Sequence, residues 1–153
     1  MATIYDLKPA FQRLLRGPAD ALARNGITAN QVTVAALLLS LVTGSVLSLF
    51  PERRWALALV PLVLFLRMAL NAIDGMLARE HGMKTRLGAV LNELGDVASD
   101  AALYLPFAAV PGVSASWVVL AVVTGILAEM AGVVAVQVGA ARRYDGSFGK
   151  SDR

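Results

Sequence analysis

The sequence predicts an all-α integral membrane protein, built as a helical bundle with an N-terminal interfacial amphipathic helix and four transmembrane helices. Three observations support this fold class. Hydrophobic residues make up 57% of the 153 residues. They gather in long uncharged runs, and a hydrocarbon core is crossed by about 20 residues of helix. Basic residues, in turn, concentrate in alternate connections between those runs.

Residues 1–27 predict an interfacial elbow, a helix pair that lies in the membrane surface. Apolar and basic side chains fall on different faces, as expected for a helix of this kind: Leu7, Phe11, Leu14 and Leu15 against Lys8, Arg13 and Arg16. Pro18 is expected to open the second short helix of the elbow. Thr28 or Asn30 is expected to cap the first span.

Four spans are expected at about residues 31–50, 55–78, 87–110 and 116–140. Pro51 marks the turn after the first span, and Pro111 with Gly112 marks the turn after the third. Gly82 is the expected turn residue of the polar loop at 79–86. Pro106 predicts a kink in the third span, because proline lacks the N–H that an inner helical turn requires.

The basic residues predict the orientation. Eleven of the 14 flank the spans on one side: Lys8, Arg13, Arg16, Arg24, Arg79, Lys84, Arg86, Arg142, Arg143, Lys150 and Arg153. Only Arg53 and Arg54 lie on the other side. By the positive-inside rule, both termini and the 79–86 loop face the cytoplasm. The net charge of +3 is therefore a topology signal, and nucleic-acid binding is not expected.

Polar side chains recur at helical spacing where the second and third spans meet. Asn71, Asp74, Gly75 and Ala78 share one helix face. A second stripe recurs every four residues on the next helix: Gly88, Asn92, Asp96 and Asp100. Ionisable groups within apolar segments are costly, so they indicate a functional site by default.

Helix rise divides these groups into two layers. The shallow layer, in the cytoplasmic half of the bilayer, offers oxygen ligands of the kind that a hard divalent cation prefers: Asn71, Asp74, Asn92, Glu93 and Asp96. We expect these groups to line a water-filled cavity open to the cytoplasm; the alternative is a purely structural polar network.

The deep layer consists of Arg67, Asp100 and Glu129. Arg67 either forms an internal salt bridge, most simply with Asp100, or binds a phosphate group. Glu129 is either a protonated structural carboxyl group or a substrate contact. The residue pattern leaves both pairs of alternatives open.

Residues 71–96 resemble the signature of the CDP-alcohol phosphotransferases, D-x2-D-G-x2-A-R-x8-G-x3-D-x3-D, with Asn71 and Asn92 at the first and third acidic positions. The resemblance implies a phospholipid-synthesising membrane enzyme. Such an enzyme transfers a phosphatidyl or similar group from a CDP-linked lipid donor to an alcohol acceptor and releases CMP. It also implies one or two divalent cations, Mg²⁺ or Mn²⁺, held by the four acidic positions.

By this resemblance, Asp96 is the catalytic base that activates the acceptor hydroxyl. The implied metal ligands are Asn71, Asp74, Asn92 and Asp96, with Glu93 and Asp100 as further candidates that restore the charge lost at the asparagines. The implied CDP-binding residues are Asp74, Gly75, Ala78, Arg79 and Gly88, with Asn30 and Thr33 as weaker candidates. The acceptor stays open among glycerol 3-phosphate, inositol phosphate, serine and another phospholipid.

The resemblance also implies a six-helix fold, so residues 28–141 are expected to form a catalytic bundle truncated before two further helices, with a basic cytoplasmic tail at 142–153. The resemblance, which is closest to a bacterial branch of the family, also implies a bacterial inner-membrane location and a possible homodimer. Two other functions remain open. One is an ion or proton-coupled transporter that relays charge through these carboxylates. The other is a catalytically silent scaffold, which the two asparagines favour.

Overall fold

The structure, a computed structural model, describes residues 4–139 of the chain. Within this range every element is helical: α1 (Ile4–Arg24), α2 (Ala29–Leu49), α3 (Arg54–Glu80), α4 (Arg86–Tyr104), the 3₁₀ helix η1 (Leu105–Ala109) and α5 (Ala115–Gln137). The predicted all-α membrane fold is confirmed. The predicted basic tail, with Arg142, Arg143, Lys150 and Arg153, lies outside the described residues.

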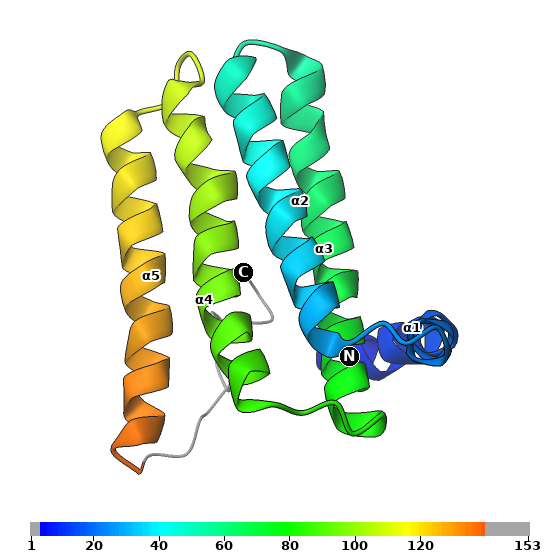
Figure 1. The fold of residues 1–153 in the computed structure, drawn as a ribbon. Coiled ribbons are helices and arrows are strands. Elements are labelled where there is room, and N and C mark those ends of the chain that lie inside the picture. The colour runs from blue at the N-terminus through cyan, green and yellow to red at the C-terminus, as the bar shows by residue number, and fades with distance from the viewer. Residues whose placement is uncertain (1–3, 140–153) are drawn as a thin grey trace.

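Helices α2 to α5 run up and down in alternation, and α1 lies crosswise at the end where α2 begins and α3 ends (Figure 1). Helix α2 packs against both α3 and α4, whereas α5 packs against α4 and η1. Helix α2 therefore lies between α3 and α4, and side chains that join α3 to α4 must reach across it.

Three helices are long and apolar enough to cross a membrane: α2, α3 and α5. Their outward faces carry large apolar side chains such as Leu38, Phe65 and Trp117. Such faces suit a lipid environment, where apolar exposure carries no cost. The chain is therefore an integral membrane helical protein.

The expected third span at 87–110 differs from the observed structure. Helix α4 ends at Tyr104 and the chain continues as the 3₁₀ helix η1. Pro106 explains the break, because it cannot donate to the carbonyl of residue 102 and its ring crowds that carbonyl. Helix α4 also carries four charged residues and is not among the three helices apolar enough to span: Arg86, Glu93, Asp96 and Asp100.

The two-helix elbow is also corrected, because α1 is one continuous helix with Pro18 inside it. Ala19 is buried in a cluster with Ile73 and Met76 of α3, so this packing holds α1 against α3. Two polar contacts add to the packing: Arg16 Nη2 lies 3.2 Å from Glu80 Oε1, and His81 Nε2 lies 3.0 Å from Asp20 Oδ1. Exposed pairs of this kind contribute at most about 1 kcal/mol each.

Local signals begin and end the helices, and those at Thr28, Gly82 and Gly112 were predicted. Thr28 caps α2 through a capping box with Gln31. Thr85 caps α4, because its Oγ1 accepts a hydrogen bond of 2.8 Å from the Gly88 N–H. Gly82 and Gly112 occupy the turns on either side of the α4–η1 segment with φ of 69° and 82°, where a side chain would be strained.

Two apolar clusters lie at opposite ends of the α2–α3 pair. One joins α1, α2 and α3 and includes Ala29, Val32, Ile73 and Leu77. The other includes Leu47, Ala56 and Val60. Thr33 and Ser40 of α2 and Arg67 and Asn71 of α3 lie between these clusters along the chain, and Asp74 follows Ile73 of the first cluster, so apolar packing positions the candidate site.

Candidate active site

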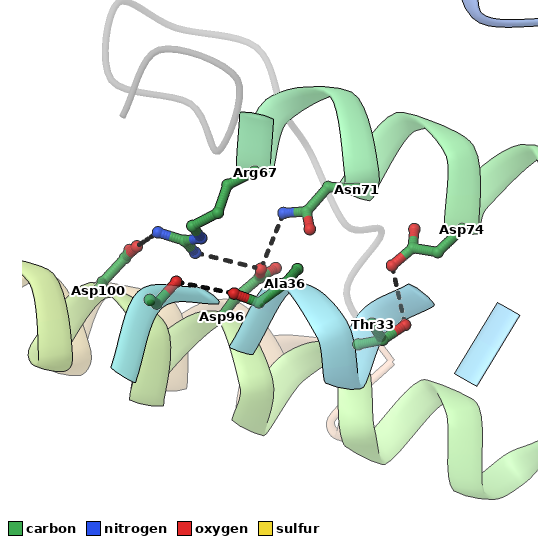
Figure 2. Close-up of polar contacts among 8 residues, drawn as sticks. Thr33, Ala36, Arg67, Asn71, Asp74, Asp96 and Asp100 are labelled. Atoms are coloured by element: carbon green, nitrogen blue, oxygen red, sulfur yellow. Dashed lines mark hydrogen bonds and ion pairs between the residues drawn. The ribbon is translucent and has the colours of Figure 1, made fainter. Parts of the chain in front are cut away.

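The two polar stripes meet across α2. Figure 2 shows Arg67, Asn71 and Asp74 of α3 pointing toward residues of α4 and α2. The amide Nδ2 of Asn71 donates to Asp96 Oδ1 at 3.1 Å. This contact joins the first motif position on α3 to the last motif position on α4, as the sequence predicted.

Asp74 turns instead toward α2. Thr33 Oγ1 donates to Asp74 Oδ2 at 2.9 Å (Figure 2). The same hydroxyl oxygen lies 3.1 Å from the Ala29 carbonyl one turn earlier. Asp74 is only 6% exposed. Thr33, expected as a nucleotide contact, thus lies against the carboxylate that is expected to bind the cation.

Arg67 joins the deep layer to the shallow one. Its Nη1 donates to Asp100 Oδ1 at 2.7 Å, and its Nη2 lies 3.7 Å from Asp96 Oδ1. Arg67 is 7% exposed, and within the described part of the chain its Nε has no hydrogen-bond partner. Of the two interpretations left open for Arg67, the structure shows the salt bridge with Asp100.

The guanidinium also faces Asp96, so its charge is opposed by two carboxylates one helical turn apart. A buried cation between two anions is attracted by both. This arrangement fixes where the Asp96 carboxylate points.

The motif glycines lie beside other motif side chains. A Cβ on Gly75 would lie 3.0 Å from Arg79 Nη2, so the guanidinium folds back along α3 over this glycine. A Cβ on Gly88 would lie 2.5 Å from Asn30 Oδ1 and 2.9 Å from Thr85 Oγ1. Both glycines therefore provide room for polar side chains at the end of the bundle that carries α1.

The other predicted residues lie near this group. Ala78, Asn92 and Glu93 are half-buried, with Asn92 one turn before Asp96 on α4. Glu129, on α5, is half-buried as well and lines a cavity together with Asp100. The deep layer is thus divided: Arg67 contacts Asp100, and Glu129 approaches from the opposite side of α4.

Two site residues were missed by the sequence analysis. Ala36 and Ser40 of α2 are 3% and 0% exposed, and Ser40 Oγ donates to the Ala36 carbonyl at 2.9 Å. These small residues form the surface over which α3 and α4 side chains meet. The spacing of Thr33, Ala36 and Ser40 on one face of an otherwise large-residue helix is the signal that could have identified them.

Comparison with known proteins agrees with the motif. Residues 26–150 match the family model described as CDP-alcohol phosphatidyltransferase. The chain belongs to the CDP-alcohol phosphatidyltransferase family. It is 54% identical over 151 residues to "Inner membrane protein YnbA" of Escherichia coli (strain K12), covering 99% of this chain and 75% of that protein.

More distant members of the CDP-alcohol phosphatidyltransferase family include "Phosphatidylinositol phosphate synthase" of Mycolicibacterium smegmatis, 36% identical over 106 residues. The protein of the same name from Mycobacterium tuberculosis (strain ATCC 25618 / H37Rv) is 36% identical over 97 residues. These matches cover 68% and 63% of this chain and 46% and 43% of the relatives, so the chain spans less than half of their length. No solved structure matches the chain.

Members of this family use divalent cations, and the side chains at the four motif positions are the candidate ligands. Among residues 4–139, no three acidic or histidine side chains gather into a metal-binding group. Two of the four motif positions are asparagine, and Asp74 turns toward Thr33 of α2. Two carboxylates and two amides on facing helices remain, and these oxygens are chemically suitable for Mg²⁺ or Mn²⁺.

Proposed function

We propose that the protein transfers a phosphatidyl group from a CDP-linked lipid, such as CDP-diacylglycerol, to an alcohol and releases CMP. Family membership supports a role in phospholipid synthesis. The single observation that carries the proposal is the 3.1 Å contact between Asn71 and Asp96, because it joins the two halves of the motif across α2.

In this proposal the shallow layer holds Mg²⁺ or Mn²⁺. The ligands are Asp74, Asp96, Asn71 and Asn92, with Glu93 and Asp100 as further candidates. A divalent cation supplies positive charge that offsets the charge of a pyrophosphate and of the departing CMP. Thr33 orients Asp74 for this role, since its hydroxyl donates to one carboxylate oxygen at 2.9 Å.

Asp96 is the proposed general base. It accepts the proton of the acceptor hydroxyl as the hydroxyl oxygen attacks the phosphorus that carries the lipid. Asn71 and Arg67 both approach Asp96 Oδ1, at 3.1 and 3.7 Å, and so hold the carboxylate in one orientation. Arg67 acts here as a positioning residue.

The nucleotide is proposed to bind at the end of the bundle that carries α1. Gly75, Ala78, Arg79 and Gly88 are the motif residues there, and Asn30 lies against Gly88. Arg79 is exposed and carries a planar fork of donors that suits phosphate oxygens. A nucleotide phosphate is expected to draw the Arg79 guanidinium away from Gly75.

We further propose that the protein resides in the bacterial inner membrane, with this end of the bundle and both termini in the cytoplasm. The basic residues of the 79–86 loop support this orientation. Residues 1–27 serve as the interfacial anchor and residues 28–141 as the catalytic bundle. A homodimer stays a prediction.

The test is CMP release from CDP-diacylglycerol by the purified full chain in detergent with Mg²⁺, with and without added alcohols. Asp74→Ala is expected to lower the rate at least about 100-fold, because a charged ligand worth several kcal/mol is lost. Glu80→Gln is the matched control on the same helix, since Glu80 forms an ion pair with Arg16 of α1 and lies outside the proposed site. Its rate should equal that of the wild type.

Calorimetric titration with CDP, together with the rate of CMP release, distinguishes the enzyme from a silent scaffold and from a transporter. Equal CMP release by the wild type and Asp74→Ala would remove Asp74 from the site. CDP binding without CMP release under any condition would favour a silent scaffold. A chain that does not bind CDP but carries ions or protons across liposomes would favour the transporter.

A further inference from the structure

A cavity of about 540 Å³ lies between α4, η1 and α5. Its volume is within the range of ligand-binding pockets. The wall is almost wholly apolar and includes Val97, Ala101, Phe107, Val122 and Ile126. Gly125 also lines it, and a Cβ at this position would meet nothing within 4 Å. The cavity is therefore open to an apolar chain alongside α5.

The cavity adjoins the polar layer through Asp100. This residue lines the cavity, and its carboxylate accepts from Arg67 at 2.7 Å. The Asp100 side chain is 45% exposed, whereas that of Asp96 is 13% exposed. Since Asp96 lies one helical turn before Asp100 on α4, a group placed at the Asp100 end is close to the proposed base.

The polar groups of the cavity favour a neutral ligand over an anionic one. They are Asp100, Glu129 and the phenol of Tyr104, and no basic residue is among the described lining residues. Arg67 lies behind Asp100, but it is buried and its charge already faces two carboxylates. A phosphate group would meet negative charge here, which disfavours it. A neutral hydroxyl can donate a hydrogen bond to a carboxylate.

We propose that this cavity binds the acceptor and that the acceptor is an uncharged lipid alcohol. Its apolar tail lies along α5, and its hydroxyl lies at the Asp100 end of the cavity and donates to Asp96, one helical turn away. This inference rests on the proposed function and narrows its substrate. In the reaction, the hydroxyl oxygen bonds to the phosphorus that carries the diacylglycerol group. The phosphorus–oxygen bond to CMP breaks, CMP leaves with the bonding pair, and Asp96 takes the hydroxyl proton.

The experiment measures CMP release from CDP-diacylglycerol by the full chain with three acceptors: 1-monooleoylglycerol, glycerol 3-phosphate and inositol phosphate. We expect only monooleoylglycerol to stimulate CMP release, with the phosphatidyl product identified by mass spectrometry. Stimulation by either phosphorylated alcohol, without stimulation by monooleoylglycerol, would overturn the proposal.

Gly125→Leu fills the cavity, and Gly132→Leu is the matched control on the same helix, where a Cβ also meets nothing within 4 Å. Gly125→Leu should reduce stimulation by monooleoylglycerol about tenfold or more, whereas Gly132→Leu should leave it unchanged. Equal effects of the two substitutions would overturn the placement of the acceptor in this cavity.

Direct binding is measured in parallel with a photoactivatable monoacylglycerol. We expect crosslinks on peptides of α4 and α5, competed by monooleoylglycerol and reduced in Gly125→Leu. Crosslinks elsewhere would overturn the inference while CDP binding and CMP release still support the proposed function. Failure to bind CDP or release CMP would instead remove the proposed function, and the acceptor assignment with it.

Discussion

At the scale of single residues, the buried guanidinium of Arg67 has the strongest consequences. It faces Asp96 and Asp100, which come from one stripe of α4. Removing one partner of a buried charge pair leaves the other charge uncompensated, and this costs more than the pair itself contributes. Arg67 therefore influences both the stability of the bundle and the position of the proposed base.

Arg67→Met is expected to lower the free energy of unfolding by about 3 kcal/mol, because Asp96 loses its buried counter-charge. The free energy of unfolding of Arg67→Lys should lie between those of Arg67→Met and the wild type, since lysine keeps the charge but loses the fork of donors. Thermal unfolding in detergent, followed by the fluorescence of Trp55 and Trp117, measures both. Equal stability of Arg67→Met and the wild type would contradict this account.

At the scale of elements, α2 is the helix that brings the motif together. Its small residues Thr33, Ala36 and Ser40 lie under the polar layer, and Gly44 lies against the backbone of α4. A Cβ on Gly44 would overlap the carbonyl oxygen of Ala102. Since that atom belongs to the backbone, the conflict can be relieved only by moving a helix.

Gly44→Ala is thus expected to destabilise the protein by about 1–3 kcal/mol through overpacking, although alanine in a helix interior usually stabilises by about 1 kcal/mol. Gly132→Ala on α5 is the matched control, because its Cβ has open space, and it should be neutral or slightly stabilising. Thermal unfolding in detergent compares the two. A stability gain in Gly44→Ala would show that α2 and α4 are not in close contact.

At the scale of the whole molecule, orientation decides which substrates reach the site. The exposed Lys84 lies between α3 and α4, at the end that carries α1, and the exposed Arg53 lies between α2 and α3 at the opposite end. Basic residues predict that the first of these ends faces the cytoplasm. A CDP-linked substrate from the cytoplasm would then approach α1, Arg79 and the 79–86 loop.

The chain has no cysteine, so single-cysteine variants report orientation without background. Arg53→Cys should react with a membrane-impermeant maleimide in spheroplasts, whereas Lys84→Cys should react only after lysis. Labelling is measured by the gel shift of the purified protein. Labelling of Lys84→Cys in intact spheroplasts would reverse the proposed orientation and the proposed cytoplasmic site.

The amino-acid sequence was enough to predict the helical membrane class, the turns at Gly82 and Gly112, and the facing stripes that include Asn71 and Asp96. These properties follow from composition, local backbone preference and helical period, all of which act within a few residues. The spacing of the motif residues can also be read directly along the chain. This spacing indicated the family to which the chain belongs.

The folded structure was needed to show that α2 lies between α3 and α4, that Thr33 holds Asp74, and that Arg67 pairs with Asp100. It also divided the third predicted span at Tyr104 and placed a cavity beside Asp100. The physical reason is that helical period fixes which residues share a face, whereas the partner of each face depends on how closely small residues let whole helices approach.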